Sequence, residues 1–249
     1  MSLNLYASIA LALILRRKRD FHQDSQILLK QFQPKPVLKN IEFIPEKGPL
    51  LVTMNHYSRP GFFILWAVVA ISSALPQNSL WLMTNAWTKR TRGLGDRLLT
   101  WLSKAFFNRL AEVYGMVTMP AMPPAPEETV ERALSIRRVM EKLREKPETI
   151  LGLAPEGMDF PDNQLGIPHA GTGKMILQVV NSLKRILPVG VYEENGRLII
   201  NFGAPYYLDI HEDEGNLDEM VIRQVMGRIA ARLPEQMHGP YRIKTEEKL

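Results

Sequence analysis

The chain has 249 residues, of which 45% are hydrophobic and 23% are charged, and this composition is typical of a folded protein and not of a disordered one. It contains no cysteine, which excludes disulfides, zinc–thiolate sites and cysteine nucleophiles. The length suits one large α/β domain or two small ones.

The net charge of +5 is unevenly distributed along the chain. Residues 1–110 carry a balance of +10, whereas residues 111–249 carry a balance of −5. A basic first half is typical of proteins that bind nucleic acid or an anionic membrane surface, and a solvated basic face without a partner is the third interpretation.

The N-terminal stretch favours the membrane among these interpretations. Residues 3–15, LNLYASIALALIL, carry no charge, and RRKR follows at 16–19. The run is shorter than the roughly 20 residues of a spanning helix, and its charges follow the apolar part, unlike those of a signal peptide. We therefore expect residues 1–33 to form a helical membrane-interface segment on the cytoplasmic face of the membrane, bound peripherally. A helix packed on its own domain and a truncated span remain the alternatives.

Beyond residue 33, apolar runs of strand length alternate with longer helical patterns, after a Pro/Lys connector at 33–40. Strands are expected at 41–45, 50–54, 80–84, 113–119 and 148–154, and as a hairpin within 185–203 that turns at Glu194-Asn195-Gly196. Helices are expected at 22–32, 60–75, 86–111, 127–146, 170–184 and 216–233. The alternation predicts one α/β domain over residues 34–249, with a mixed, mostly parallel sheet and helices on both faces.

Several chemistries find no support in the sequence. The five histidines have no ligand spacing with a carboxylate, so we expect no metal site. GTGK at 171–174 lacks the first glycine and the final hydroxyl residue of a phosphate loop, and no serine lies in a nucleophile elbow. Aromatic residues are not interleaved with basic ones, and no nucleic-acid motif is present.

Two strand ends carry the polar residues from which a reaction centre can be built. His56 follows Asn55 directly after the strand at 50–54, and Glu156, Asp159 and Asp162 follow the strand at 148–154. A histidine beside a carboxylate is the arrangement of a general base, because the acid fixes the tautomer of the ring. The plainer alternatives are a structural histidine and an ordinary turn at Pro155-Glu156-Gly157.

Asn55-His56 and Pro155-Glu156-Gly157, about a hundred residues apart, resemble motifs of the phospholipid/glycerol acyltransferases, such as the 1-acylglycerol-3-phosphate acyltransferases. LPVGVY at 187–192 and IAARLPEQMHGPY at 229–241 are similar to later segments of that family, so the resemblance covers roughly residues 40–240. It implies an O-acyltransferase that moves a fatty acyl group from acyl-CoA or acyl carrier protein to a lipid or glycerol hydroxyl. His56 would be the general base, the acyl thioester a co-substrate, and no cofactor would be needed.

The sequence departs from the family pattern at three positions. Gly61 stands where the acid of N-H-x-x-x-x-D is expected, no arginine ends YGMVTMP, and Asp159 stands where the third motif has arginine. We hypothesise that Asp159 or Glu156 supplies the missing acid from the other loop.

The loss of two arginines predicts an acceptor without a phosphomonoester, because arginine is the residue that clamps phosphate. The expected catalytic residues are thus His56, Glu156 and Asp159. The expected substrate-binding residues are Asn55, Arg59, Pro155, Gly157 and Lys174, with Arg59 and Lys174 as substitutes for the lost arginines. A catalytically silent lipid- or acyl-binding relative and a basic nucleic-acid-binding protein remain open alternatives.

Overall fold

The computed structural model describes residues 2–59, 61–86, 94–122, 125–160, 163–210 and 216–242. Three basic residues of the expected 86–111 helix, Lys89, Arg90 and Arg92, lie outside this part of the chain, as does Asp162.

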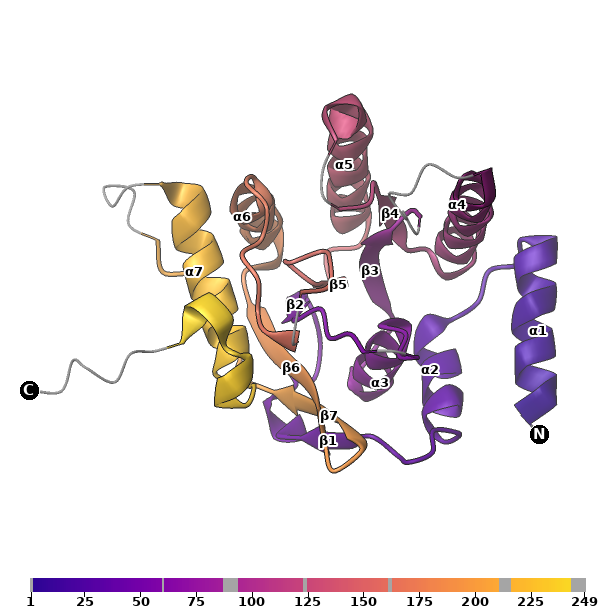
Figure 1. The fold of residues 1–249 in the computed structure, drawn as a ribbon, viewed down its shortest axis with the longest axis horizontal. Coiled ribbons are helices and arrows are strands. Elements are labelled where there is room, and N and C mark those ends of the chain that lie inside the picture. Colours follow the sequence, from indigo (N-terminus) through magenta and orange to yellow (C-terminus); the bar gives the residue numbers. More distant parts are fainter. Residues whose placement is uncertain are drawn as a thin grey trace, which may run out of the picture.

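The described residues form a single α/β domain around a seven-stranded mixed sheet with the order β1-β7-β6-β2-β5-β3-β4 (Figure 1). Adjacent strands are parallel except β6 and β7, which form the antiparallel hairpin. The strands are β1 Val37–Lys39, β2 Leu50–Met54, β3 Ser79–Thr84, β4 Val117–Met119, β5 Ile150–Leu153, β6 Ile186–Glu194 and β7 Arg197–Phe202. The fold class predicted from the alternation of strands and helices is therefore confirmed.

Helices cover both faces of the sheet. Helices α5, α6 and α7 lie together on one side, and α2, α3 and α4 lie on the other, with α1 at the outer edge beside α4 (Figure 1). The helices are α1 Ser2–Leu15, α2 Phe21–Leu29, α3 Leu65–Ala74, α4 Leu94–Tyr114, α5 Thr129–Glu145, α6 Thr172–Leu183 and α7 Leu217–Ala230. Three-residue 3-10 turns occur at Ile41–Phe43, Pro126–Glu128, Glu235–Met237 and Gly239–Tyr241.

The core lies along the central strands. All five residues of β2 and all four of β5 are buried, as expected for parallel strands that are covered on both faces. Leu50, Leu51 and Ile150 have no exposed surface. This packing fixes the ends of β2 and β5, from which the loops with His56 and Glu156 leave the sheet.

Two predicted strands were wrong in position. Residues 41–45 do not form an edge strand: Ile41–Phe43 is a 3-10 turn, because Asn40 adopts a left-handed conformation at φ 59° and ends the preceding strand. That strand, β1, lies inside the stretch expected to be a connector. The strand predicted at 113–119 is shorter in the structure, because helix α4 continues to Tyr114. Gly115, which adopts φ 72°, ends this helix, and the strand begins only at Val117.

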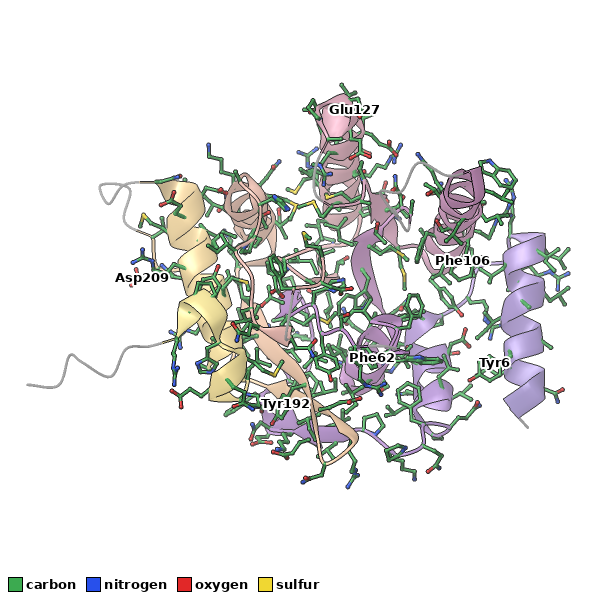
Figure 2. The ribbon with its side chains drawn as sticks, viewed as in Figure 1. Tyr6, Phe62, Phe106, Glu127, Tyr192 and Asp209 are labelled. Atoms are coloured by element: carbon green, nitrogen blue, oxygen red, sulfur yellow. The ribbon has the colours of Figure 1, made fainter. Side chains whose placement is uncertain are left out.

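Helix α1 combines features of two of the alternatives for the N-terminus. Leu5 and Ala12 are buried against the domain, whereas Tyr6, Leu11, Ile14 and Leu15 are exposed; Tyr6 is labelled in Figure 2. One of the basic residues that follow this helix is engaged within the protein, since Arg19 donates to both carboxylate oxygens of Asp24 at 2.6 Å. No helix in the described part of the chain is long and apolar enough to cross a bilayer.

Candidate active site

The two loops expected to carry the chemistry lie side by side. Strand β2 pairs in parallel with β5, with Thr53 opposite Leu153, so that both strands end at the same edge of the sheet. His56 follows β2 and Glu156 follows β5, and the carboxyl edge of a parallel sheet is where ligands of α/β proteins commonly bind. The parallel pairing therefore brings together residues that are a hundred positions apart.

Asn55 fastens the loop after β2 to the neighbouring strand. Its amide donates to the Val191 carbonyl oxygen at 2.8 Å and accepts from the Val191 N–H at 2.7 Å. The side chain is buried and uses both ends of its amide as a peptide group would, which explains why asparagine suits the position. Asn55 was expected to bind substrate; its contacts instead hold the backbone that presents His56.

Glu156 joins three segments of backbone. Its Oε2 accepts from the His56 N–H and its Oε1 accepts from the Gly166 N–H, both at 2.7 Å. The residue is 2% exposed, and this burial raises the pKa of its carboxyl from the ordinary 4.5 to about 7. Glu156 thus contacts the main chain of His56 and not its ring, so it holds the loop instead of orienting the imidazole.

Asp159 is the carboxylate that meets the histidine ring. Its Oδ1 lies 2.7 Å from His56 Nδ1, and this hydrogen bond holds the pKa of Asp159 below its usual range. A carboxylate only accepts, so Nδ1 carries the proton of the bond and the lone pair of a neutral ring is on Nε2. Gly61 adopts φ 76°, a conformation that favours glycine over aspartate. The carboxylate that contacts the ring therefore comes from the loop after β5.

A mostly apolar cavity of about 590 Å³ adjoins this pair, and we call it the His56 cavity. It lies between the strand ends and helices α3 and α4, and both His56 and Asp159 line it. Its apolar lining includes Phe62, Phe63, Leu65, Val68, Trp81, Phe107 and Met116. A mostly apolar site of this size with the His56–Asp159 pair in its lining fits a ligand whose chain is apolar and whose reactive group is polar.

Of the remaining residues expected to bind substrate, some line the cavities and others do not. Pro155 and Gly157 line a second cavity next to the first, and Gly157 lines both. Arg59 forms an ion pair with Glu193, with 2.7 Å between Nε and Oε1. Lys174 is exposed and lies outside the lining of the cavities around His56. Neither cation is therefore placed as a ready substitute for a phosphate-binding arginine.

The GTGK segment is closed to anions in this fold. It forms the start of α6, and the backbone N–H groups of Gly171 and Lys174 each donate to the Asp218 carboxylate at 2.8 Å. A carboxylate from α7 thus occupies the helix N-terminus where a phosphate would otherwise bind. This agrees with the absence of a complete phosphate-loop motif.

Sequence reasoning missed Arg132 and His169, which also line the second cavity. Arg132 lies on a helix whose pattern of charges is that of any solvated surface helix, and His169 stands alone in a loop. No spacing signal separates either residue from its neighbours. Among the described residues, no cluster of three or more histidine, aspartate and glutamate side chains is arranged to hold a metal ion.

Comparisons with known proteins place the chain in a family. No curated protein matches the chain significantly. One solved structure that resembles it is the 1-acyl-sn-glycerophosphate (LPA) acyltransferase PlsC from Thermotoga maritima, with 16% sequence identity, 90% of each chain covered and a TM-score of 0.48. The model of the Acyltransferase family matches residues 35–192, which is more than half of the chain and includes both His56 and Glu156. The chain therefore belongs to the Acyltransferase family.

Proposed function

We propose that the protein transfers a fatty acyl group from an acyl thioester, acyl-CoA or acyl carrier protein, to the hydroxyl of a lipid acceptor, with His56 as the general base. The observation that carries this proposal is the 2.7 Å hydrogen bond between His56 Nδ1 and Asp159 Oδ1 at the edge of the His56 cavity. Membership of the Acyltransferase family supports the reaction class.

The reaction is a direct transfer in which no redox partner is needed. Nε2 of His56 takes the proton of the acceptor hydroxyl as its oxygen attacks the thioester carbonyl carbon. The new C–O bond forms and the C–S bond breaks, and the proton passes from the imidazolium to the departing sulfur. An ester and a free thiol result, and general-base assistance of this kind contributes on the order of 10²–10⁴ in rate.

Two carboxylates would support His56 in different ways. Asp159 fixes the ring through Nδ1 and stabilises the imidazolium that forms during transfer. Glu156 acts as a positioning residue, because its two oxygens bind the N–H groups of His56 and Gly166. Of the two residues hypothesised to supply the missing acid, Asp159 would thus contact the ring and Glu156 the backbone.

The His56 cavity would hold the acyl chain of the donor. Its apolar lining includes Val68, Trp81 and Phe107, and His56 also lines it. This combination matches a long hydrocarbon that ends in a thioester. We further propose that the acceptor carries no phosphomonoester. Arg59 is paired with Glu193, and Asp159 adds negative charge next to the base.

The protein would work on a membrane surface, held peripherally on its cytoplasmic face. Within the expected membrane segment 1–33, α2 packs on α3, and α1 presents the exposed apolar side chains. Helix α4, which lies beside α1, adds further exposed apolar side chains: Leu98, Trp101, Leu102 and Phe106, the last of which is labelled in Figure 2. Phe107 of the same helix lines the His56 cavity, so one helix would contact both the lipid and the acyl chain.

The test is thiol release from long-chain acyl-CoA by wild type and His56→Ala, with glycerol phosphate, lysophospholipid and neutral hydroxy-lipid acceptors. We expect release that needs an acceptor, is fastest with a neutral hydroxy lipid and vanishes in His56→Ala. His22→Ala is a matched control, because His22 lies on α2 and contacts Ser72 and Gln26. If acyl-CoA binds but no acceptor gives release, the proposal is wrong and the chain is a silent acyl-binding member of its family.

A further inference from the structure

A second cavity lies on the other side of the strand ends, between α5 and α6, and we call it the Arg132 cavity. Its volume is about 360 Å³. It shares part of its lining with the His56 cavity: Leu82, Met83, Thr84, Ala121, Met122, Ala154 and Gly157 border both. The reaction needs two substrates that meet at one base, and the two adjoining cavities give each substrate a place.

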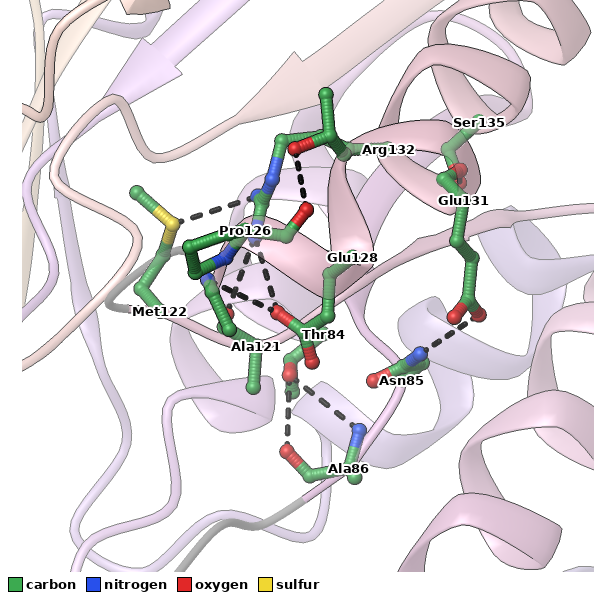
Figure 3. Close-up of polar contacts among 12 residues, drawn as sticks. Thr84, Asn85, Ala86, Ala121, Met122, Pro126, Glu128, Glu131, Arg132 and Ser135 are labelled. Carbon is green, nitrogen blue, oxygen red and sulfur yellow. Dashed lines mark hydrogen bonds and ion pairs between the residues drawn. The ribbon is translucent and has the colours of Figure 1, made fainter.

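Arg132 is the single cation in the described lining of these two cavities. It extends from α5 toward the loop after β4, where Nη2 donates to the Ala121 carbonyl oxygen at 3.2 Å and Nη1 donates to Met122 Sδ at 3.4 Å (Figure 3). Its side chain is largely buried. A guanidinium has five N–H donors in a fixed plane, so these contacts orient it and leave donor capacity for a ligand.

His169 is another polar residue in the lining of the Arg132 cavity, and within the described part of the chain it lacks a partner at one ring nitrogen. Its Nε2 atom is fully buried and has no hydrogen-bond partner in the described structure, and the residue lines the cavity at the start of α6. A buried polar atom without a partner is destabilising. A rotation of the His169 ring toward the cavity would give Nε2 a ligand oxygen as partner.

The charge around Arg132 is already balanced. Glu128 forms an ion pair with it, with 3.6 Å between Nη2 and Oε2, whereas the next carboxylate on the helix, Glu131, is engaged by Asn85 and Lys104 (Figure 3). A dianionic phosphate would therefore meet a guanidinium whose charge is largely neutralised, beside a carboxylate that repels it. A neutral group that accepts hydrogen bonds meets no such repulsion.

We propose that the Arg132 cavity binds the polar head of the acceptor and that this acceptor is a neutral single-chain hydroxy lipid of the monoacylglycerol type. Arg132 donates to the ester or hydroxyl oxygens of the head, and His169 Nε2 bonds to another oxygen. Methionines 83, 119, 122 and 175 line the cavity and adapt to the adjoining carbon atoms. The inference rests on the proposed function, because it assigns the substrate class and two specificity residues to the same site.

The experiment measures binding and not turnover, so that its result is independent of catalysis. In the His56→Ala protein, calorimetry would compare monodecanoylglycerol with decanoylglycerol phosphate, both below their critical micelle concentrations. We expect the neutral lipid to bind more tightly, and Arg132→Ala to weaken its binding about tenfold or more, as expected for hydrogen bonds to a charged donor. His169→Phe should weaken it as well. Arg138→Ala is the matched control, because Arg138 is an exposed residue of the same helix outside the cavity lining.

Glu128→Gln separates this inference from a purely structural role of Arg132. The variant keeps an oxygen that can accept from Ala125 but removes the charge that neutralises Arg132. We expect the lipid preference of Glu128→Gln to move toward the phosphate lipid. Arg132→Lys is the conservative variant of the guanidinium, and thermal unfolding reports whether both variants are folded. Tighter binding of the phosphate lipid to the parent protein, or unchanged affinity in folded Arg132→Lys and Glu128→Gln, would overturn the inference. Binding that follows these expectations in a protein without transferase activity would remove the proposed reaction and keep the binding site.

Discussion

His56 Nδ1 lies 2.7 Å from Asp159 Oδ1, although 103 positions separate the two residues in the sequence. Strands β2 and β5 pair in parallel and end at the same edge, and their two loops bring the ring and the carboxylate together. Asn55 and Glu156 hold the backbone of His56 from two directions, through Val191 and through Gly166. His56 is thus held by three polar residues from two loops, Asn55, Glu156 and Asp159, and each has a different partner.

Asp159→Asn should abolish most of the acyl transfer while the protein stays folded. The amide can present its NH₂ group to Nδ1, which favours the tautomer with the proton on Nε2, and the base then faces the acceptor in the wrong form. A comparable change in a serine protease triad costs about 10⁴ in kcat. Asp159 is 59% exposed, so its loss should hardly affect thermal unfolding. Glu127→Gln, on an exposed turn, is the control, and a variant with wild-type kcat would exclude Asp159 as the orienting acid.

Glu156→Gln should change how stability depends on pH. Burial raises the pKa of Glu156 to about 7, so folding favours its protonated form. The stabilisation from that form is fully present below pH 4.5 and is lost as the pH rises toward 7. The free energy of unfolding of wild type relative to the variant should therefore fall by on the order of 3 kcal/mol across this window.

Denaturant unfolding at a series of pH values measures this difference. Glu127→Gln again provides the control, because Glu127 is exposed and far along the chain from Glu156. A constant difference between wild type and Glu156→Gln from pH 4.5 to 7 would show that the carboxyl binds protons equally in the folded and unfolded states, and so that burial does not raise its pKa.

Ile14→Ser should weaken binding to anionic vesicles about tenfold or more, because an isoleucine that enters the lipid contributes about 1.5–3 kcal/mol. Ile14 is 74% exposed on α1, so the substitution leaves the core intact. Ile41→Ser is the matched control, since Ile41 is 56% exposed on the turn between β1 and β2. Equal losses in cosedimentation for the two variants would argue against α1 as the membrane contact.

Val68→Phe should reduce transfer of long acyl chains more than transfer of short ones. Val68 is a buried residue of α3 that lines the His56 cavity, and a larger side chain there removes space without touching the base. The measurement is the ratio of kcat/KM for palmitoyl-CoA to that for octanoyl-CoA. Val130→Phe, on the exposed side of α5, should leave the ratio unchanged. An unchanged ratio in folded Val68→Phe would place the acyl chain elsewhere.

Much of the fold was predictable because its central strands carry strong local signals. The apolar run at 50–54 and the Asn195-Gly196 turn each became the expected element. Residues 37–45 were not predictable, because the pairing of Val37 with Ile199 is a long-range contact and the turn at Ile41 depends on the backbone of Asn40.

The candidate site was likewise predictable only in part. His56 and Glu156 could be placed at the ends of two strands from the sequence, and the hypothesis that a carboxylate crosses between loops is met in the structure by the contact of Asp159. The sequence could not show that Asn55 and Glu156 bind backbone, because their partners, Val191, His56 and Gly166, are chosen by the fold. Arg132 was missed for the same reason: its contact with Ala121 exists only once α5 packs beside the end of β4.

The most direct test of the central claim is a double-mutant cycle on His56 and Asp159, with acyl transfer to one neutral acceptor measured as ester formed. If the two residues act as one unit, His56→Ala with Asp159→Ala should be no slower than His56→Ala alone, because the carboxylate works only through the ring. Asp159→Ala alone should lose on the order of 10²–10⁴ in kcat. Losses that multiply in the double variant, or transfer that persists in His56→Ala, would contradict a base at His56 that Asp159 orients.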